Sequence, residues 1–249
     1  MTALVLQSCH EWPRAGWRLR AMESVRAWAA GINAAYRFLD DALFDPVPGA
    51  LRARHAGQPV VLTDLARLMA LEQALAEGYE AAVWLDSDVF VAAPHRLFLP
   101  DGAFLPGREV WVQADRRGRP KAYRKVHNAA LLVRPGGATL AFYREAAGHM
   151  LARAEPPLVP QFIGPKFLSA LHNMVGFDVW DGVGMLSPLA LRDAARGGGP
   201  ALARTLAGHD SAPAAVNLSA SMIGRGSDGV RPDAAMMDAA MDRLPALLG

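Results

Sequence analysis

The stretch AAVWLDSDVFV, residues 81–91, contains the pattern from which the fold of this chain can be predicted. Its first five residues are apolar, which is typical of a β-strand that is covered on both faces. Two carboxylates, Asp86 and Asp88, follow this strand directly, at the end where α/β sheets bind their ligands. Because residues two apart in an extended segment point to the same side, we expect both carboxylates to converge on one point.

Two converging carboxylates repel each other unless a positive charge lies between them. Mg²⁺ and Mn²⁺ prefer oxygen ligands, and Mg²⁺ usually takes one or two carboxylates and completes its shell with water and substrate phosphates. The pair Asp86 and Asp88 therefore predicts a site for Mg²⁺ or Mn²⁺ and a phosphorylated substrate, most simply a nucleotide diphosphate. The alternative for a bare Asp-x-Asp is a turn with two solvated carboxylates.

Apolar segments and helical patterns alternate along the rest of the chain. Strands are expected at residues 3–7, 35–39, 81–85, 110–113, 129–133 and 177–180, and helices at residues 18–30, 64–77, 138–151 and 165–172. The helix at 64–77 has the clearest pattern, with Thr63 as its expected N-cap and Gly78 as its stop signal. This alternation predicts an α/β domain with a largely parallel sheet.

The composition excludes several classes of protein. The chain has 249 residues, of which 52% are hydrophobic and 20% charged, so it can bury a sizeable core and is not of the disordered class. A net charge of +2 gives little support for a nucleic-acid partner, so none is expected. Cys9 is the single cysteine, which excludes an intramolecular disulfide and a Cys-rich zinc site.

Missing signals narrow the prediction further. No apolar run approaches the ~18 residues of a transmembrane helix, and the N-terminus lacks the pattern of a signal peptide, so we expect a cytoplasmic protein without a transmembrane segment. The sequence contains neither a Gly-x-Gly-x-x-Gly after the first strand nor a P-loop, and no His-x-x-x-His pair. These absences argue against dinucleotide enzymes, P-loop NTPases and zinc hydrolases.

Residues 60–92 resemble the sugar-nucleotide-binding region of GT-A glycosyltransferases, in particular the retaining transferases with a DXD sugar-binding region. The resemblance rests on Asp64 at a helix start, Arg67 three residues later, the pair Gly78-Tyr79, and the apolar strand that leads into Asp86-Ser87-Asp88. It implies a single GT-A domain with a mixed, mostly parallel sheet that is flanked by helices.

Weaker similarities to the same family continue along the chain, at residues 36–41, 127–133, 164–168, 185–188 and 216–221. The resemblance therefore implies a GT-A-like domain over residues 1–221. Residues 222–249 would form a C-terminal segment that is helical and packed on the same domain. In the last matching stretch, Asn217 replaces a histidine that the family often carries there. An amide oxygen can also bind Mg²⁺ or Mn²⁺, so Asn217 is the candidate third metal ligand.

The resemblance implies a metal-dependent, retaining glycosyltransferase that moves a sugar from a UDP- or GDP-sugar to a glycan or lipid-linked acceptor. It assigns Asp86 to the ribose of the donor or to the metal, it assigns Asp88 to the metal, and it identifies no catalytic residue. Gln7 and Ser8 are added because they end the first strand, where they could contact the nucleotide base. The candidate donor-binding residues are Gln7, Ser8, Asp64, Arg67, Asp86, Ser87 and Asn128; the acceptor-side candidates are Gly164, Pro165 and Ser221; the metal candidates are Asp86, Asp88 and Asn217.

Two other features suggest contacts with partners. Residues 116–125 contain six cations together with Gly118 and Pro120, which predicts a basic loop. Such a loop could close over the diphosphate or receive an anionic acceptor or lipid head group, although basic loops are often only solvated. Trp12, Trp17 and Trp28 could mark a peripheral membrane contact, or they could be aromatic side chains of the core and of the substrate cleft.

Two alternative functions remain open from the sequence. A haloacid-dehalogenase-like phosphatase also carries Asp-x-Asp after an apolar strand, but normally after the first strand and with a different continuation. A non-catalytic GT-A-like domain that binds a nucleotide is the other alternative, and the substitution at Asn217 supports it.

Overall fold

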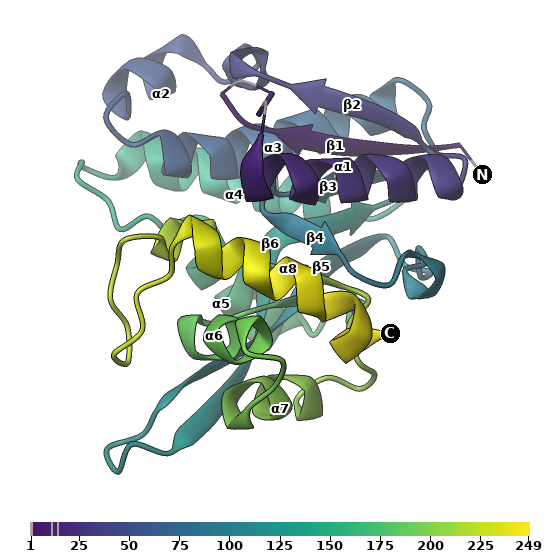
Figure 1. The fold of residues 1–249 in the computed structure, drawn as a ribbon. Coiled ribbons are helices and arrows are strands. Elements are labelled where there is room, and N and C mark those ends of the chain that lie inside the picture. Colours follow the sequence, from purple (N-terminus) through teal and green to yellow (C-terminus); the bar gives the residue numbers. More distant parts are fainter. Residues whose placement is uncertain (1, 11, 14) are drawn as a thin grey trace.

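The computed structural model describes residues 2–10, 12–13 and 15–249. A five-stranded sheet forms its centre (Figure 1). Its strands, in the order in which they pair, are β2 (Ala35–Leu39), β1 (Ala3–Ser8), β3 (Ala81–Leu85), β6 (Pro120–Val133) and β5 (Phe104–Ala114). Strand β1 is parallel to β2 and β3, whereas β6 is antiparallel to β3 and β5. The predicted α/β class with a mixed sheet is confirmed.

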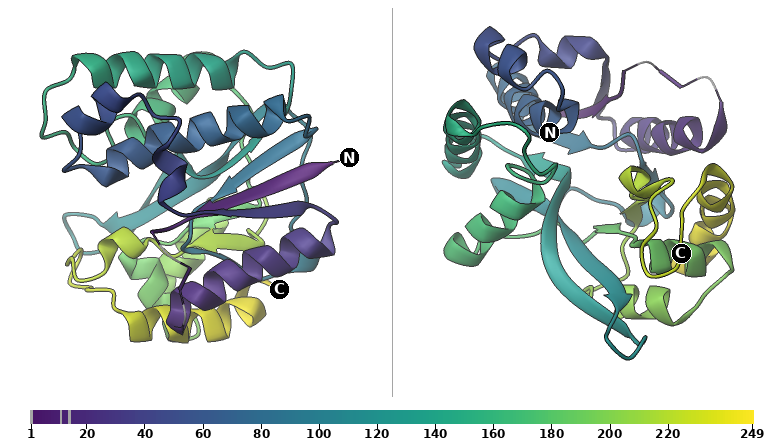
Figure 2. Two further views of the ribbon diagram at one scale, coloured as in Figure 1. Left: turned by 90° about the horizontal axis from the view of Figure 1, so that it is seen from above. Right: turned by 90° about the vertical axis from the view of Figure 1, so that its left-hand side faces the viewer.

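Helices cover both faces of this sheet (Figure 2). They are α1 (Gly16–Gly31), α2 (Gly49–Arg54), α3 (Pro59–Ala76), α4 (Thr139–Arg153) and α5 (Pro165–Val175). Strand β3 is buried along its whole length because its side chains alternate between two cores. Trp84 packs with the apolar residues of α3 and α4, whereas Val83 and Leu85 pack with those of α1.

A second, smaller sheet continues the chain beyond the Asp-Ser-Asp stretch. It consists of β4 (Val89–Val91), β8 (Ala215–Asn217) and β7 (Val183–Met185), in the order in which they pair. The helices of this part of the chain are α6 (Pro188–Ala195), α7 (Pro200–Ala207) and α8 (Ala234–Leu248). Strands β4 and β8 pair antiparallel, with Val89 opposite Asn217, so Asn217 is brought next to Asp88. Met237, Met241 and Leu244 of α8 are buried in a core that they share with α1 and α6.

The predicted start of the helix at 64–77 is wrong. Helix α3 begins five residues earlier, at Pro59, because proline is well suited to the first turn of a helix. Thr63 is therefore not an N-cap; it lies inside the helix, and its hydroxyl donates a hydrogen bond to the carbonyl of Pro59 at 2.9 Å.

The strand predicted at 177–180 is also wrong. Of these residues, Trp180 makes an isolated bridge to Gly107, and the segment otherwise has no ladder. Its apolar residues serve packing instead: the ring of Phe177 lies 5.2 Å from that of Phe104, and Trp180 lies 6.3 Å from Trp28. The apolar pattern therefore indicated that these residues are buried. A buried segment does not have to pair as a strand.

The basic loop predicted at 116–125 is mostly strand. Strands β5 and β6 form a long twisted hairpin whose ladder extends to the pair Ala114 and Pro120. The turn is confined to residues 115–119, because the Asp115 carboxylate accepts hydrogen bonds from the backbone N–H groups of Arg117 and Arg119 at 2.8 and 2.9 Å. Cations that the sequence analysis placed in a loop are thus held at defined positions of β6.

Trp12, Trp17 and Trp28, which lie close together in the sequence, occupy different places in the fold. Trp17 and Trp28 are buried in the core, and Trp12 packs edge-on against Tyr36 and Phe38. Within the residues that the structure describes, no helix has both the length and the apolar character needed to cross a bilayer.

Candidate functional site

Asp86 and Asp88 lie in a turn at the carboxyl end of β3. The backbone N–H of Asp86 donates to the carbonyl of Ala129 on β6 at 2.8 Å, and the N–H of Val89 donates back to the carbonyl of Asp86 at 3.0 Å. The extended geometry predicted for these residues is wrong, because this hydrogen bond closes a turn over residues 86–88. The two carboxylates nevertheless interact. Burial and the charge of Asp86 raise the pKa of Asp88 to about 6.

The Asp86 side chain is fixed by two donors on the same oxygen. The indole Nε1 of Trp84 donates to Oδ1 at 2.7 Å, and Nη1 of Arg67 lies 3.1 Å from it. The guanidinium of Arg67 also stacks over the Trp84 ring at 5.3 Å. The sequence analysis missed Trp84, although its position two residues before Asp86 in a strand was a signal, because side chains two apart share a face.

Arg67 belongs to a buried network with Asp64 and Asn128. Its Nη2 lies 3.1 Å from Oδ1 of Asp64, and its Nη1 donates to the backbone carbonyl of Asn128 at 2.6 Å. Asn128 in turn donates its side-chain N–H to Oδ1 of Asp64 at 2.8 Å. Burial raises the pKa of Asp64 to about 6 against the opposing charge of Arg67. Three residues proposed as donor-binding are thus brought together, and their polar groups mostly bind one another.

The beginning of α5 is seated against this network. A Cβ atom on Gly164 would lie 2.3 Å from Oδ2 of Asp64 and 3.0 Å from Nδ2 of Asn128, so the close approach requires glycine. Pro165 follows as the first residue of α5. The two acceptor-side candidates, Gly164 and Pro165, therefore adjoin the donor-side candidates.

Gln7 connects the first strand to the acidic turn. Its side-chain N–H donates to the backbone carbonyl of Asp86 at 3.1 Å, and its side-chain oxygen accepts from the Tyr36 hydroxyl at 3.0 Å. Gln7 is fully buried, so in this structure it orients the turn. Ser8 is half-buried at the end of β1, and Ser87 is half-buried in the turn. Tyr36 is a further residue that sequence reasoning missed.

The Asp88 side chain is held by the segment that follows β8. Asn217 donates its side-chain N–H to Oδ1 of Asp88 at 2.6 Å, and the backbone N–H of Ala220 donates to Oδ2 at 2.8 Å. The amide oxygen of Asn217 accepts from the N–H of Ser219 at 2.7 Å, which sets the orientation of the amide. Asn217 therefore presents its nitrogen, not its oxygen, to Asp88. Ser221 is exposed beside Ala220.

A cation from α1 faces the same carboxylate. The positive charge of Arg18 lies close enough to Asp88 to oppose the rise in its pKa. No motif in the sequence marked Arg18, which reaches the site only because α1 packs beside β4. The turn is thus approached by Arg67 on the side of Asp86 and by Arg18 on the side of Asp88.

The residues of this turn fit a divalent cation whose coordination shell is completed by water and by the substrate. In the described part of the chain, no three His, Cys, Asp or Glu side chains gather into a metal site. Two carboxylates alone suit Mg²⁺ or Mn²⁺, because such ions keep several positions for water and phosphate oxygens. Burial, and next the charge of Asp86, raise the pKa of Asp88, and a nearby positive charge would oppose both effects.

Comparison with solved structures identifies the fold. The chain is similar to a glycosyltransferase involved in the glycosylation of the major capsid of PBCV-1, with a TM-score of 0.53 and 13% identity over 97% of this chain and 99% of that chain. A galactosyltransferase, LgtC, solved with donor and acceptor sugar analogues, aligns with a TM-score of 0.44 and 14% identity over 100% of this chain and 96% of that chain. No protein-family model matches the sequence, and neither does any curated protein. The predicted GT-A fold is confirmed by the first of these likenesses.

Proposed function

We propose that this chain is a glycosyltransferase that takes a sugar from a nucleotide-diphosphate donor, with the Asp86–Asp88 turn at the donor diphosphate. One observation carries the proposal: the carboxylates of Asp86 and Asp88 stand at the carboxyl end of a central strand, and each is held by its own donors. That edge is where α/β sheets bind ligands. The fold shared with a glycosyltransferase supports the same function.

In this proposal Asp86 and Asp88 hold Mn²⁺ or Mg²⁺. When bound, the ion would supply positive charge to the diphosphate as it leaves the sugar. The chain's own contribution is to keep both carboxylates in place: Trp84 and Arg67 orient Asp86, and Asn217 and Ala220 orient Asp88. For Asn217 to act as the third ligand, its amide would have to turn away from its bond to Ser219. We therefore propose positioning of Asp88 as its primary role.

The remaining candidates receive roles according to their places around the turn. In this proposal Ser87 and Ser8 contact the donor. Asp64, Arg67 and Asn128 form a buried network that supports the turn. Gly164, Pro165 and Ser221 border the acceptor side, where a glycan or lipid-linked sugar would enter. A retaining outcome is part of the proposal, and it asks for no general base from the protein.

Thermal unfolding with UDP and with GDP, each with and without Mn²⁺, tests this function. A diphosphate at about a hundred times its Kd adds about 2.7 kcal/mol to the stability of the native state. For a chain of this size, that corresponds to a rise in Tm of roughly 5–10 °C. We expect this rise only with Mn²⁺, and its loss in the double variant Asp86→Asn and Asp88→Asn.

The matched control is Asp45→Asn with Asp101→Asn, which removes two exposed carboxylates away from the turn. It should keep the full metal-dependent rise. If neither nucleotide raises the Tm of the wild-type protein, the donor site is misplaced.

A non-catalytic nucleotide-binding domain is the second candidate, because the amide of Asn217 presents its nitrogen to Asp88. An assay for hydrolysis of UDP- and GDP-sugars separates the two, since a binder would show metal-dependent stabilisation without turnover. The phosphatase alternative places its aspartate after the first strand, whereas Asp86 follows β3, the central strand of the sheet.

A further inference from the structure

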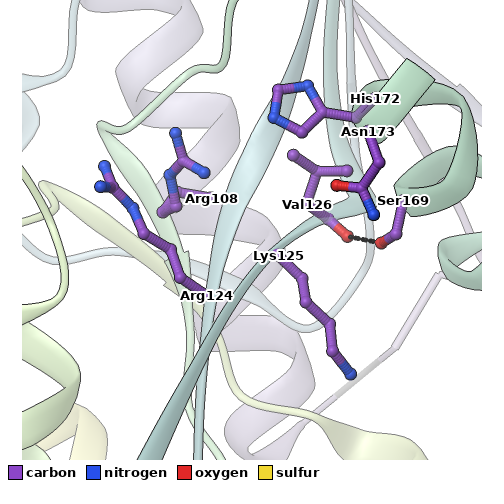
Figure 3. Close-up of a pocket in the computed structure, with 7 residues that line it drawn as sticks. All are labelled: Arg108, Arg124, Lys125, Val126, Ser169, His172 and Asn173. Atoms are coloured by element: carbon purple, nitrogen blue, oxygen red, sulfur yellow. Dashed lines mark hydrogen bonds between the residues drawn. The ribbon is translucent and has the colours of Figure 1, made fainter. Parts of the chain in front are cut away.

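A basic cavity lies between the β5–β6 hairpin and α5 (Figure 3). Its volume is about 430 Å³. The hairpin contributes Arg108, Arg124 and Lys125, and α5 contributes Ser169, His172 and Asn173. The side chains of Arg108 and Arg124 lie on one side of the hairpin and the Lys125 side chain points to the other (Figure 3), and the acidic residues Asp86 and Asp88 are not part of the lining. Such a set of groups is suited to an anion.

The positive charge of this cavity is only partly compensated. Arg108 lies 3.4 Å from Oδ1 of Asp181, but the same carboxylate also accepts hydrogen bonds from the backbone N–H groups of Asp210 and Ser211. Arg124 pairs with Asp210 at 2.7 Å, but this carboxylate is 74% exposed. An exposed pair of this kind is weak and is easily exchanged for another anion.

Lys125 is the neighbour of Arg124 on β6, and its side chain points away from the two arginines (Figure 3), so it does not add to their charge. The two arginines also crowd each other. Burial, and next the charge of Arg124, lower the pKa of Arg108 below its usual value. An anion in the cavity would relieve this repulsion.

The cavity shares two walls with the acidic turn. Gly164, at the start of α5, touches Asp64 and Asn128, whereas Ser169 and His172 lie about 7 and 12 Å farther along the same helix at 1.5 Å per residue. On β6, Asn128 and Val126 are about 7 Å apart. Ser169 joins the two walls by donating to the carbonyl of Val126 at 3.3 Å. A short saccharide can bridge this separation.

We propose that the basic cavity binds a phosphate group carried by the acceptor, while the acceptor hydroxyl reaches the sugar donor at the Asp86–Asp88 turn. This inference rests on the proposed function for its second half, whereas phosphate binding in the cavity stands by itself. Arg108 and Arg124 supply planar forks that suit phosphate oxygens. The phosphate belongs to a soluble sugar phosphate or to a lipid head group.

The test compares two double variants that remove the same charge from one hairpin. Arg108→Gln with Arg124→Gln changes the cavity, and Arg116→Gln with Arg117→Gln changes the exposed turn at the hairpin tip. Binding of inorganic phosphate and of glucose 1-phosphate is measured by calorimetry. We expect the cavity variant to bind both about tenfold more weakly than the wild-type protein and the tip variant to bind within twofold of it.

Sedimentation with vesicles distinguishes the two sources of the phosphate. Binding to phosphatidic acid vesicles but not to phosphatidylcholine vesicles, weakened by the cavity variant alone, assigns the cavity to a lipid head group. Binding of glucose 1-phosphate without vesicle binding assigns it to a soluble acceptor. Both results support the inference.

Metal-dependent stabilisation by UDP is recorded in parallel, because it reports on the donor site alone. If the double variant Asp86→Asn with Asp88→Asn loses the stabilisation by UDP but still binds phosphate, the donor site and the phosphate site are independent of each other. The inference is overturned if the wild-type protein binds neither phosphate compound nor acidic vesicles. Equal weakening by both hairpin variants, or phosphate binding that depends on the acidic turn instead of the cavity, also overturns it.

Discussion

The acidic turn and the basic cavity hold their charges in opposite ways. Around the turn, Arg67 and Asp64 are nearly fully buried, and each of their polar groups has a partner within the network. In the cavity, Arg124 is 47% exposed and its partner Asp210 is 74% exposed. The first arrangement excludes water and the second is open to it.

This difference determines what each region can do. A buried charge network is rigid, because the movement of one member would leave its buried partners without a contact that water cannot replace. It therefore suits a site in which two carboxylates must keep their places. Exposed cations with weakly held partners can exchange those partners for a ligand at little cost. Charged side chains thus form a fixed support in one region and a binding surface in the other.

The largest effect should come from breaking the buried network. Arg67→Ala leaves Asp64 and Asp86 without their cation, and removal of one partner of a buried ion pair costs about 3–5 kcal/mol. Arg124→Ala is the matched change in the basic cavity and should cost about 0–1 kcal/mol. Urea unfolding at pH 7 measures both. Equal losses in the two variants would remove the distinction between the regions.

Glu109 extends the comparison to a buried carboxylate that has no ion pair with any residue the structure describes. It lies on β5 opposite Lys125, and its exposed fraction is 8%. Burial raises its pKa to about 7, against the charge of Lys125. The folded state therefore favours the protonated form, so the stability that Glu109 contributes is fully present below about pH 4.5 and is lost as the pH rises through 7.

Glu109→Gln should remove this pH dependence. The variant should match the wild-type protein at pH 4 and exceed its unfolding free energy at pH 8 by up to about 3 kcal/mol. Urea denaturation between pH 4 and 8 measures the difference. A wild-type advantage that grows with pH would mean that Glu109 is ionised in a favourable pair.

The smallest effect should come from steric pressure on the network. Gly164→Ala forces Asp64 or Asn128 to move, because the new Cβ meets both, and overpacking of this kind costs about 1–3 kcal/mol. Gly148→Ala is the control: this glycine lies inside α4 with no atom near its added Cβ, so alanine should be neutral or stabilise by up to about 1 kcal/mol. Thermal unfolding compares the two. A stable Gly164→Ala variant with unchanged UDP binding would show that the network is not tightly packed against α5.

The local pattern of the sequence was a reliable guide for β2 and β3, whose bounds agree with the predicted ranges at both ends. The pattern failed at residues 177–180, which are buried but do not pair as a strand. It also failed where an element extends beyond its apolar residues, as in α3 and in the β5–β6 hairpin. Pro165 and Ser221 were expected near the site by resemblance. In the structure Pro165 follows Gly164, which adjoins the network, and Ser221 follows Ala220, whose N–H binds Asp88. Only the structure identified Trp84, Tyr36 and Arg18 as residues of the site.

What the sequence determined by itself is the apolar strand and the two carboxylates that follow it, because an apolar run and the residues next to it are local properties of the chain. What only the tertiary structure decided is which groups meet those carboxylates. Asn217 reaches Asp88 from 129 residues away through the pairing of β4 with β8. Arg67 meets Asp86 because α3 packs on the face of the sheet that carries Trp84. The value of a charge depends on its burial and its partners, and both are set by contacts between distant segments.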